Sequence, residues 1–454
     1  MKKLLAFIFL ISSFAQAQYT INGTMAPILE SDWVILYKIE GASQKYVQDS
    51  KIKINTIDVQ GKKQKIGTFS FTLPKDTEAG SYRVTYKLEN AGYVDFIFNK
   101  ENLNFGFHPD YPEQTVTFSI SKENILYRKY LEKISNAQQQ LDSIQITALQ
   151  NPSLDLKSAY QTSLNKVNSI QNEYLTNSKD MYVAPFIKAN SRNNPSEILD
   201  NPQTYMSNII DTFFYDVDFT NKTLLNSSFL IDKITDYIFY INYSDDPNTQ
   251  QILFKNSVDK VIYKFKNIPY KKSIIEFLID QFETTMNLEL IDYLFENHYY
   301  KLPKTIQDQK YITSKRALFA TGIGRVAPDF SWIENGKNFK LSTLNDSEKY
   351  VLVFWSTTCS HCLNEVPKLH SFLKENKAVE VIAFALEDDE FGWKNYKTNL
   401  PNWHHVLGLK KWQNKIARTY NINATPTYFI LDKDKKIIAK PESLEDVKTF
   451  INKQ

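Results

Sequence analysis

This sequence has few cysteines, little net charge and no long apolar run in its main part, and each shortage excludes a class of protein. Only two of its 454 residues are cysteines, so a scaffold of several disulfide bonds is excluded. The net charge of +3 is too small for the basic surface that binding to nucleic acid or anionic lipid requires. After the N-terminal segment, no run approaches the roughly 18 apolar residues of a membrane-spanning helix. Charged residues make up 23% of the chain, which is typical of a folded globular protein.

The first 17 residues have the pattern of a secretory signal peptide. Lys2-Lys3 precedes an apolar run at residues 4–11, and Ala15-Gln16-Ala17 supplies the small residues of a cleavage site. The sequence therefore predicts cleavage before Gln18 and export of a chain that is not membrane-spanning. Since neither cysteine lies at this cleavage point, we expect no lipid-modified N-terminal cysteine.

Three regions with different periodicity follow the signal peptide. Residues 18–120 alternate between apolar and polar positions, which predicts a small antiparallel β-sandwich. Residues 121–320 have apolar residues at helical spacing after a candidate N-cap, Ser121, which predicts an α-helical domain. Residues 321–454 alternate strands with helices, and this order predicts an α/β domain with a parallel strand pair.

The two cysteines lie in the sequence Cys359-Ser360-His361-Cys362, between a predicted strand at 349–355 and a predicted helix at 360–375. A thiol in the first turn of a helix faces unpaired backbone N–H groups, which favour the thiolate. A thiolate can attack a disulfide, and a second cysteine one turn later can resolve the mixed disulfide that results. The spacing therefore predicts Cys359 as the nucleophile and Cys362 as the resolving residue.

Zinc sites use the same cysteine spacing and provide an alternative. The chain has no second cysteine pair, so zinc would require ligands from His361, His370, His404 or His405. The position between a strand and a helix favours redox chemistry, and we expect no resident metal.

Further segments of the C-terminal region follow one another in a fixed order: Gly324–Phe330 (GRVAPDF), Lys340–Ser342 (KLS), Val353–Cys359 (VFWSTTC), Glu365–Pro367 (EVP) and Ala424–Thr427 (ATPT). In this order they resemble a thioredoxin-fold domain of the TlpA/ResA-like group of exported thiol-disulfide oxidoreductases. Some bacterial envelope proteins of this kind place a small β domain and a helical segment before that domain. The resemblance implies a periplasmic location, no cofactor, disulfide-bearing envelope proteins as substrates and a membrane thiol donor. Some members of the group serve cytochrome c-type biogenesis.

The resemblance also implies roles for residues near the cysteines. Glu365 would take or give the proton of Cys362, although a solvated charge on a helix would have the same spacing. A cis bond between Thr425 and Pro426 would present the Thr425 backbone to a substrate strand, whereas an ordinary turn proline would not.

Two further residues close to the cysteines are candidates for the site. Trp355 is expected to pack beside the pair and contribute to substrate binding, and a simple core role fits its position equally well. A cationic His361 would stabilise the Cys359 thiolate and make the pair more oxidising, whereas an exposed neutral histidine would not.

The sequence departs from the family pattern at several positions. Val353 stands where thioredoxin itself has a buried Asp, which favours the TlpA-like group. Thr358 replaces the Trp that often precedes the first cysteine, and Lys435 occupies a turn position where Gly is common.

Two other functions compete with thiol-disulfide exchange. A peroxidase of the peroxiredoxin group would have a Pro at Leu352 and a Ser or Thr at Ser356, and only the second requirement is met. A non-enzymatic protein- or metal-binding module built on a thioredoxin fold is the other alternative. The sequence leaves open the substrate, the redox partner and whether the chain is a reductant, isomerase or oxidase.

Overall fold

The computed structural model describes residues 18–29, 31–59, 61–87, 92–374, 376 and 378–453. The predicted signal peptide, residues 1–17, lies outside these ranges. The described residues form two compact units, one up to Gln281 with Asp292–Leu302, the other Phe282–Ile291 with the chain from Pro303 onward. None of the helices in these ranges combines the length and the apolar character needed to cross a membrane. The domain boundaries at residues 120 and 320 stay predictions.

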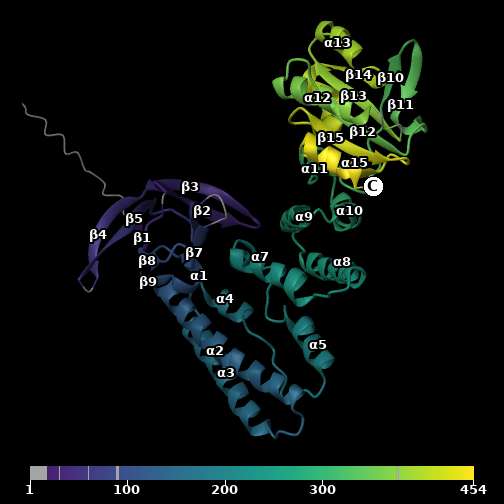
Figure 1. Cartoon of the computed structure of the whole chain (residues 1–454). Helices are drawn as coiled ribbons and strands as arrows, with labels where there is room; N and C mark the ends of the chain where they lie inside the picture. Colours follow the sequence, from purple (N-terminus) through teal and green to yellow (C-terminus); the bar gives the residue numbers. More distant parts are fainter. Residues whose placement is uncertain are drawn as a thin grey trace, which may run out of the picture. The chain divides into compact units, whose positions relative to one another are not determined.

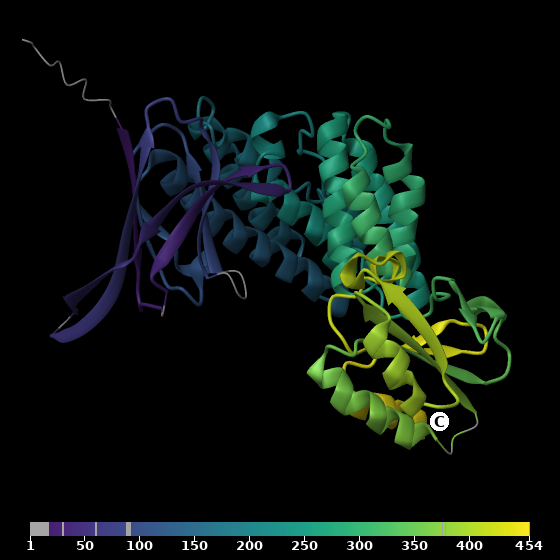
Figure 2. The same ribbon diagram turned by 90° about the horizontal axis from the view of Figure 1, so that it is seen from above.

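The first unit begins with two β-sheets (Figures 1 and 2). Their strands are β1 (Gln18–Met25), β2 (Trp33–Glu40), β3 (Ser43–Lys51), β4 (Lys53–Val59), β5 (Lys62–Pro74), β6 (Gly80–Lys87), β7 (Gly92–Phe98), β8 (Leu103–Phe107) and β9 (Thr117–Ile120). One sheet has the order β4-β5-β1-β8-β9 and the other β3-β2-β6-β7. Alternate residues of both sheets, such as Phe71 and Phe96, meet in one core, as expected for a sandwich.

One strand pairing could not be predicted from the alternating pattern. β1 and β8 run parallel, with Ile21 beside Leu103, while the other paired strands of these two sheets are antiparallel. Alternation places every second side chain on the core face whichever way the neighbouring strand runs. The pattern therefore predicts the buried face and not the direction of the pairing.

Helices follow β8 in the sequence, and residues 282–291 within this series belong to the second unit. The helices are α1 (Pro112–Thr115), α2 (Lys122–Gln150), α3 (Lys157–Asn177), α4 (Ala184–Ala189), α5 (Pro202–Thr212), α6 (Lys222–Leu225), α7 (Ser228–Thr235), the π-helix η1 (Asp236–Ile241), α8 (Pro247–Lys264), α9 (Ile268–Thr284), α10 (Leu288–Asn297) and η2 (Tyr299–Lys301). α2 and α3 lie against each other (Figure 1). The predicted N-cap is confirmed, since the Ser121 hydroxyl accepts the Asn124 backbone N–H at 3.1 Å.

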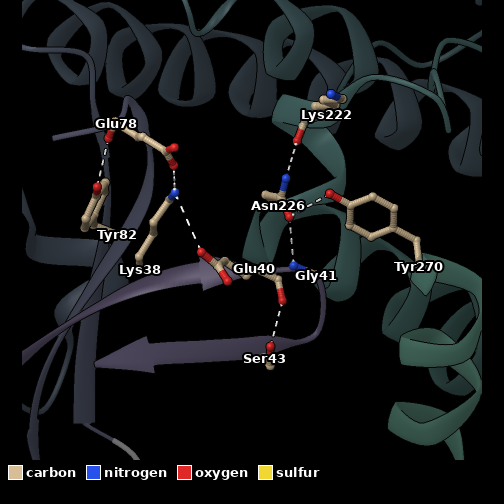
Figure 3. A network of polar contacts seen from close by, with 9 residues as sticks. All are labelled: Lys38, Glu40, Gly41, Ser43, Glu78, Tyr82, Lys222, Asn226 and Tyr270. Carbon is tan, nitrogen blue, oxygen red and sulfur yellow. Dashed lines mark hydrogen bonds and ion pairs between the residues drawn. The ribbon is translucent and has the colours of Figure 1, made fainter. Parts of the chain in front are cut away.

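Asn226 joins the turn between β2 and β3 to the helices of the same unit (Figure 3). Its Oδ1 accepts hydrogen bonds from the Gly41 backbone N–H at 3.1 Å and from the Tyr270 hydroxyl at 3.0 Å. Its Nδ2 donates to the Lys222 carbonyl at 3.0 Å. Gly41 has a φ of +63°, and a Cβ at this position would lie 3.3 Å from Ser273 Oγ. A glycine therefore suits both the turn and the close contact with α9.

The second unit contains the predicted α/β arrangement. Its elements after α10 are α11 (Gln309–Ala320), β10 (Ser331–Glu334), β11 (Lys337–Lys340), η3 (Leu341–Thr343), β12 (Lys349–Trp355), α12 (Ser360–Leu373), β13 (Val379–Glu387), α13 (Phe391–Tyr396), η4 (Lys397–Asn399), β14 (His404–Leu409), η5 (Lys411–Gln413), α14 (Lys415–Thr419), β15 (Thr427–Asp432), β16 (Ile437–Ala439) and α15 (Leu444–Asn452). The main sheet has the order β14-β13-β12-β15-β16. β12, β13 and β14 are parallel, which confirms the predicted parallel pair, and β15 and β16 are antiparallel.

β12 lies at the centre of this sheet and is buried on both faces. Val351, Val353 and Trp355 pack with apolar residues of α12 and α15 on one side. Leu352 and Phe354 pack on the other side with residues of β10 and α14. The strand therefore forms a fixed base for the cysteine sequence that follows it.

Lys435 adopts the backbone conformation of the glycine that it replaces. Its φ is +62°, a left-handed conformation that glycine adopts most readily. Its buried ammonium donates a hydrogen bond to the Leu344 carbonyl at 2.7 Å and lies 4.1 Å from the centre of the Tyr350 ring. These contacts offset the cost of a side chain at this turn position.

Replacing Asn226 tests the attachment of the β2–β3 turn. Asn226→Ala leaves the Gly41 N–H without its acceptor, and we expect the free energy of unfolding to fall by about 1–3 kcal/mol in urea denaturation. Asn165→Ala, at an exposed position on α3, is the control and should change the free energy by less than about 0.5 kcal/mol. Equal stability of the two variants would contradict the assigned role.

Candidate active site

The cysteine sequence lies where β12 ends and α12 begins. Cys359 is the N-cap of α12, and its sulfur accepts the backbone N–H of Cys362 at 3.4 Å. The Cys359 backbone N–H donates to the Ser356 carbonyl at 3.2 Å, which closes the turn between strand and helix. The predicted helix start is therefore present, and the Cys359 sulfur faces the unpaired N–H groups of the first turn.

The two free thiols lie in different surroundings. Cys359 is partly exposed and Cys362 is fully buried. Burial raises the pKa of Cys362 to about 12, and its hydrogen bond with Cys359 adds to this rise. Partial burial also acts to raise the pKa of Cys359, but hydrogen bonds with Cys362, Thr425 and the His361 backbone outweigh it and hold this pKa below its ordinary value. The accessible sulfur is thus the one that ionises more easily.

The loop before β15 lies beside the first cysteine. The peptide bond between Thr425 and Pro426 is cis, as the resemblance implies. The Cys359 sulfur lies 3.3 Å from the Thr425 carbonyl oxygen. The structure therefore brings together Cys359, Cys362, Thr425 and Pro426, which are about 65 residues apart in the sequence.

Glu365 lies one helical turn beyond Cys362 and is half-buried. Its Oε2 accepts a hydrogen bond from the Tyr428 hydroxyl at 2.9 Å. Tyr428 is almost fully buried and follows Pro426 by two positions on β15. Burial, followed by the Glu365 carboxylate, raises the pKa of Tyr428 well above its ordinary value, so this hydroxyl remains a donor. Tyr428 could not be predicted from the sequence, because no neighbouring residue indicates that its side chain reaches α12.

Trp355 is buried beside the cysteine pair, whereas His361 is exposed. Trp355 is 0% exposed, packs in the same apolar cluster as Cys362 and has its ring 5.4 Å from that of Tyr396. In this position its side chain is not accessible to a substrate, and it packs with the cysteines inside the apolar core. His361 is exposed on the first turn of α12. Its predicted influence on the thiolate stays a prediction.

Glu387 is a buried carboxylate that supports the loop before Cys359. It is 3% exposed and lies at the end of β13. Its Oε1 accepts the Thr357 backbone N–H at 2.6 Å, and its Oε2 accepts the Ser356 hydroxyl at 3.3 Å. The sequence analysis missed this residue, although its place at the carboxyl end of a parallel strand, beside the end of β12, is a signal for a site residue.

Three of the four histidines considered as zinc ligands, His370, His404 and His405, have other contacts. The His404 ring lies between Glu334 and Glu380, with 2.8 Å from each ring nitrogen to a carboxylate oxygen. His405 and His370 each have a ring nitrogen within 3.0 Å of a backbone carbonyl oxygen. In the ranges that the structure describes, no three His, Cys, Asp or Glu side chains are placed to hold a metal ion.

The arrangement is suited to thiol-disulfide chemistry. An accessible sulfur with a lowered pKa can attack a disulfide, and a buried thiol beside it can displace the product. A carboxylate one turn away can accept the proton that the buried thiol must lose.

Known proteins match the part of the chain that contains this site. A family model described as thioredoxin-like matches residues 347–437. The thiol-disulfide oxidoreductase ResA of Bacillus thuringiensis (strain Al Hakam) is 32% identical over 119 residues, which are 26% of this chain and 67% of the relative. The ResA protein of Bacillus anthracis matches equally well. The family match and the sheet order confirm the predicted thioredoxin-like fold of the C-terminal region.

Solved structures also resemble this chain. A domain of a possible thiol-disulfide isomerase from Cytophaga hutchinsonii is 29% identical with a TM-score of 0.26, and the match covers 29% of this chain and 92% of that one. The thioredoxin domain of a thiol-disulfide oxidoreductase from Bacteroides vulgatus is 25% identical with a TM-score of 0.27, and the match covers 29% and 96% of the two chains.

The different surroundings of the two thiols predict selective alkylation. In the folded, reduced chain at about pH 7, iodoacetamide should modify Cys359 and leave Cys362 intact, as mapped by mass spectrometry. The rate at Cys359 should follow an ionisation midpoint below that of an ordinary cysteine, because its pKa is lowered. The denatured chain is the control and should be modified at both positions. Equal modification of both thiols in the folded chain would overturn the assignment.

The His404 cluster predicts a pH-dependent stability. Partial burial acts to lower the pKa of His404, but Glu380 and Glu334 outweigh it, so this pKa is raised. A raised folded-state pKa stabilises the fold below about pH 6.5, and this contribution disappears as the pH rises through the folded-state value. At about pH 6, His404→Gln should lower the free energy of unfolding by about 1–3 kcal/mol in urea denaturation.

The difference between wild type and His404→Gln should shrink at about pH 9, where the histidine is neutral in both folded and unfolded chains. His370→Gln removes a histidine outside this cluster and is the matched control. If the difference in free energy of unfolding between wild type and His404→Gln stayed constant between about pH 6 and about pH 9, His404 would not change its protonation state in this range, and the prediction would be wrong.

Proposed function

Since this chain belongs to the ResA family of thioredoxin-like thiol-disulfide oxidoreductases, we propose that it reduces or exchanges disulfide bonds of cell-envelope proteins through Cys359 and Cys362. Export to the periplasm is part of this proposal and is supported by the signal-peptide pattern of residues 1–17. The relatives named ResA support the reaction class.

The position of Cys359 is the observation on which the proposal mainly rests. Its sulfur caps α12, is partly exposed and lies 3.3 Å from the Thr425 carbonyl. An extended substrate segment that pairs with the Thr425 backbone would bring its disulfide next to this sulfur. Pro426, which has no N–H group, leaves the loop open on that side.

The reaction takes place in two exchange steps. The Cys359 thiolate attacks one sulfur of the substrate disulfide, so a mixed disulfide forms and the other substrate sulfur leaves as a thiolate. Cys362 then loses its proton and attacks the Cys359 sulfur, which releases the second substrate thiolate. The pair ends as a disulfide, and its two electrons have passed to the substrate, whose thiolates take up two protons.

The buried position of Cys362 separates the two steps. With a pKa raised to about 12, this thiol stays protonated while Cys359 attacks. In this proposal Glu365, one helical turn beyond Cys362, removes the proton in the second step. A dithiol donor must return two electrons to the Cys359–Cys362 disulfide before another cycle, and we propose a membrane-bound thiol protein for this task.

Single cysteine variants test the proposal with oxidised insulin as substrate. Cys362→Ser should accumulate a mixed disulfide between Cys359 and an insulin chain, because nothing resolves it. Cys359→Ser should form no such adduct, and both variants should lose multiple-turnover insulin reduction in dithiothreitol. Adducts formed through Cys362 rather than Cys359, or turnover without Cys359, would refute the assigned roles.

A further inference from the structure

Tyr428 connects the strand after the cis-proline loop with the helix that contains the cysteines. It belongs to β15, and its hydroxyl donates to Glu365 Oε2 on α12 at 2.9 Å. Its ring packs in the apolar cluster that includes Cys362 and Trp355. Its position is therefore fixed by packing, and its single polar atom is directed at the carboxylate.

The groups around this hydrogen bond are few and identifiable. The charged or titratable groups that act on Tyr428 are Glu365, Cys362 and Cys359, all from α12 and its cap. From α15, which packs in the same cluster, the residues that face it are apolar: Leu444, Val447 and Ile451. Glu365, one helical turn beyond the Cys362 thiol that must lose a proton, thus accepts a hydrogen bond from a hydroxyl that keeps its own.

A hydrogen bond donated to a carboxylate favours its ionised form, which is the form able to accept a proton. It also fixes the side-chain orientation, since Glu365 is half-buried and would otherwise be free to turn into solvent. Cys362 depends on such a base, because burial keeps its thiol protonated and a thiol does not attack a disulfide.

We infer that Tyr428 is a positioning residue that holds the Glu365 carboxylate ready to take the proton of Cys362 while the mixed disulfide is resolved. This inference rests on the proposed thiol-disulfide exchange. In the step itself, the Cys362 S–H bond breaks and its proton passes to Glu365. The new Cys362–Cys359 bond forms as the bond to the substrate sulfur breaks, and the substrate leaves as a thiolate.

The two exchange steps can be followed separately with an aromatic disulfide, 5,5′-dithiobis(2-nitrobenzoate), in stopped flow. The first thiolate release reports attack by Cys359 and depends on reagent concentration. The second release reports resolution by Cys362 and does not depend on it. Tyr428→Phe should leave the first phase within about twofold of wild type, and should slow the second phase about tenfold at about pH 7.

Three further variants make the test specific. Glu365→Gln, which cannot accept the proton, should slow the second phase at least as much as Tyr428→Phe does, and Tyr428→Phe should add nothing in this background. Tyr420→Phe removes another buried tyrosine hydroxyl, which donates to the Pro328 carbonyl in the opposite core cluster, and should leave both phases unchanged.

The possible results distinguish this inference from the proposed function. A second phase of Tyr428→Phe at the rate of wild type would overturn the positioning role, and so would additive effects with Glu365→Gln. Equal slowing of both phases, or the same slowing in Tyr420→Phe, would show a structural role instead. A wild-type chain that releases only one equivalent of thiolate would overturn the proposed function and this inference with it.

Discussion

The backbone N–H groups at the start of α12, which point at the Cys359 sulfur, are the interaction on which the chemistry of this chain depends. Two features set the position of these N–H groups. β12 is buried on both faces, so the end of the strand is held in place, and the hydrogen bond from the Cys359 N–H to the Ser356 carbonyl closes the turn that leads into α12. The same turn leaves Cys359 partly exposed and Cys362 fully buried. One local geometry thus produces an accessible sulfur that ionises easily and a protected one that does not.

Three parts of the fold meet around this helix start. β15 and the loop before it bring the Tyr428 hydroxyl to Glu365 and the Thr425 carbonyl to Cys359, and the end of β13 brings Glu387 to the loop before the cysteines. These partners belong to two strands of the one mixed sheet or to the loop before one of them. The sheet order therefore determines which residues meet at the site, and the sequence Cys359–Cys362 supplies only its central part.

This explains which features the sequence could predict. Cys359, Cys362, Pro426 and the helix start were identifiable, because each is encoded by neighbouring residues or by a short sequence with a known geometry. Tyr428 and Glu387 were missed, because their contacts cross 63 and 30 positions of the chain. The parallel pairing of β1 and β8 was missed for a related reason, since alternation is the same in both strand directions. In the first unit, the contacts of Gly41 with Asn226 and Ser273 could likewise not be predicted, because they join residues far apart in the sequence.

The reduction potential of the Cys359–Cys362 pair tests the central claim most directly, by titration of the full chain in dithiothreitol or glutathione buffers. We expect one reversible two-electron transition at a potential between about −270 and −120 mV, because the lowered pKa of Cys359 stabilises the reduced form. A pair that does not interconvert reversibly, or a potential below about −300 mV as in structural disulfides, would contradict it.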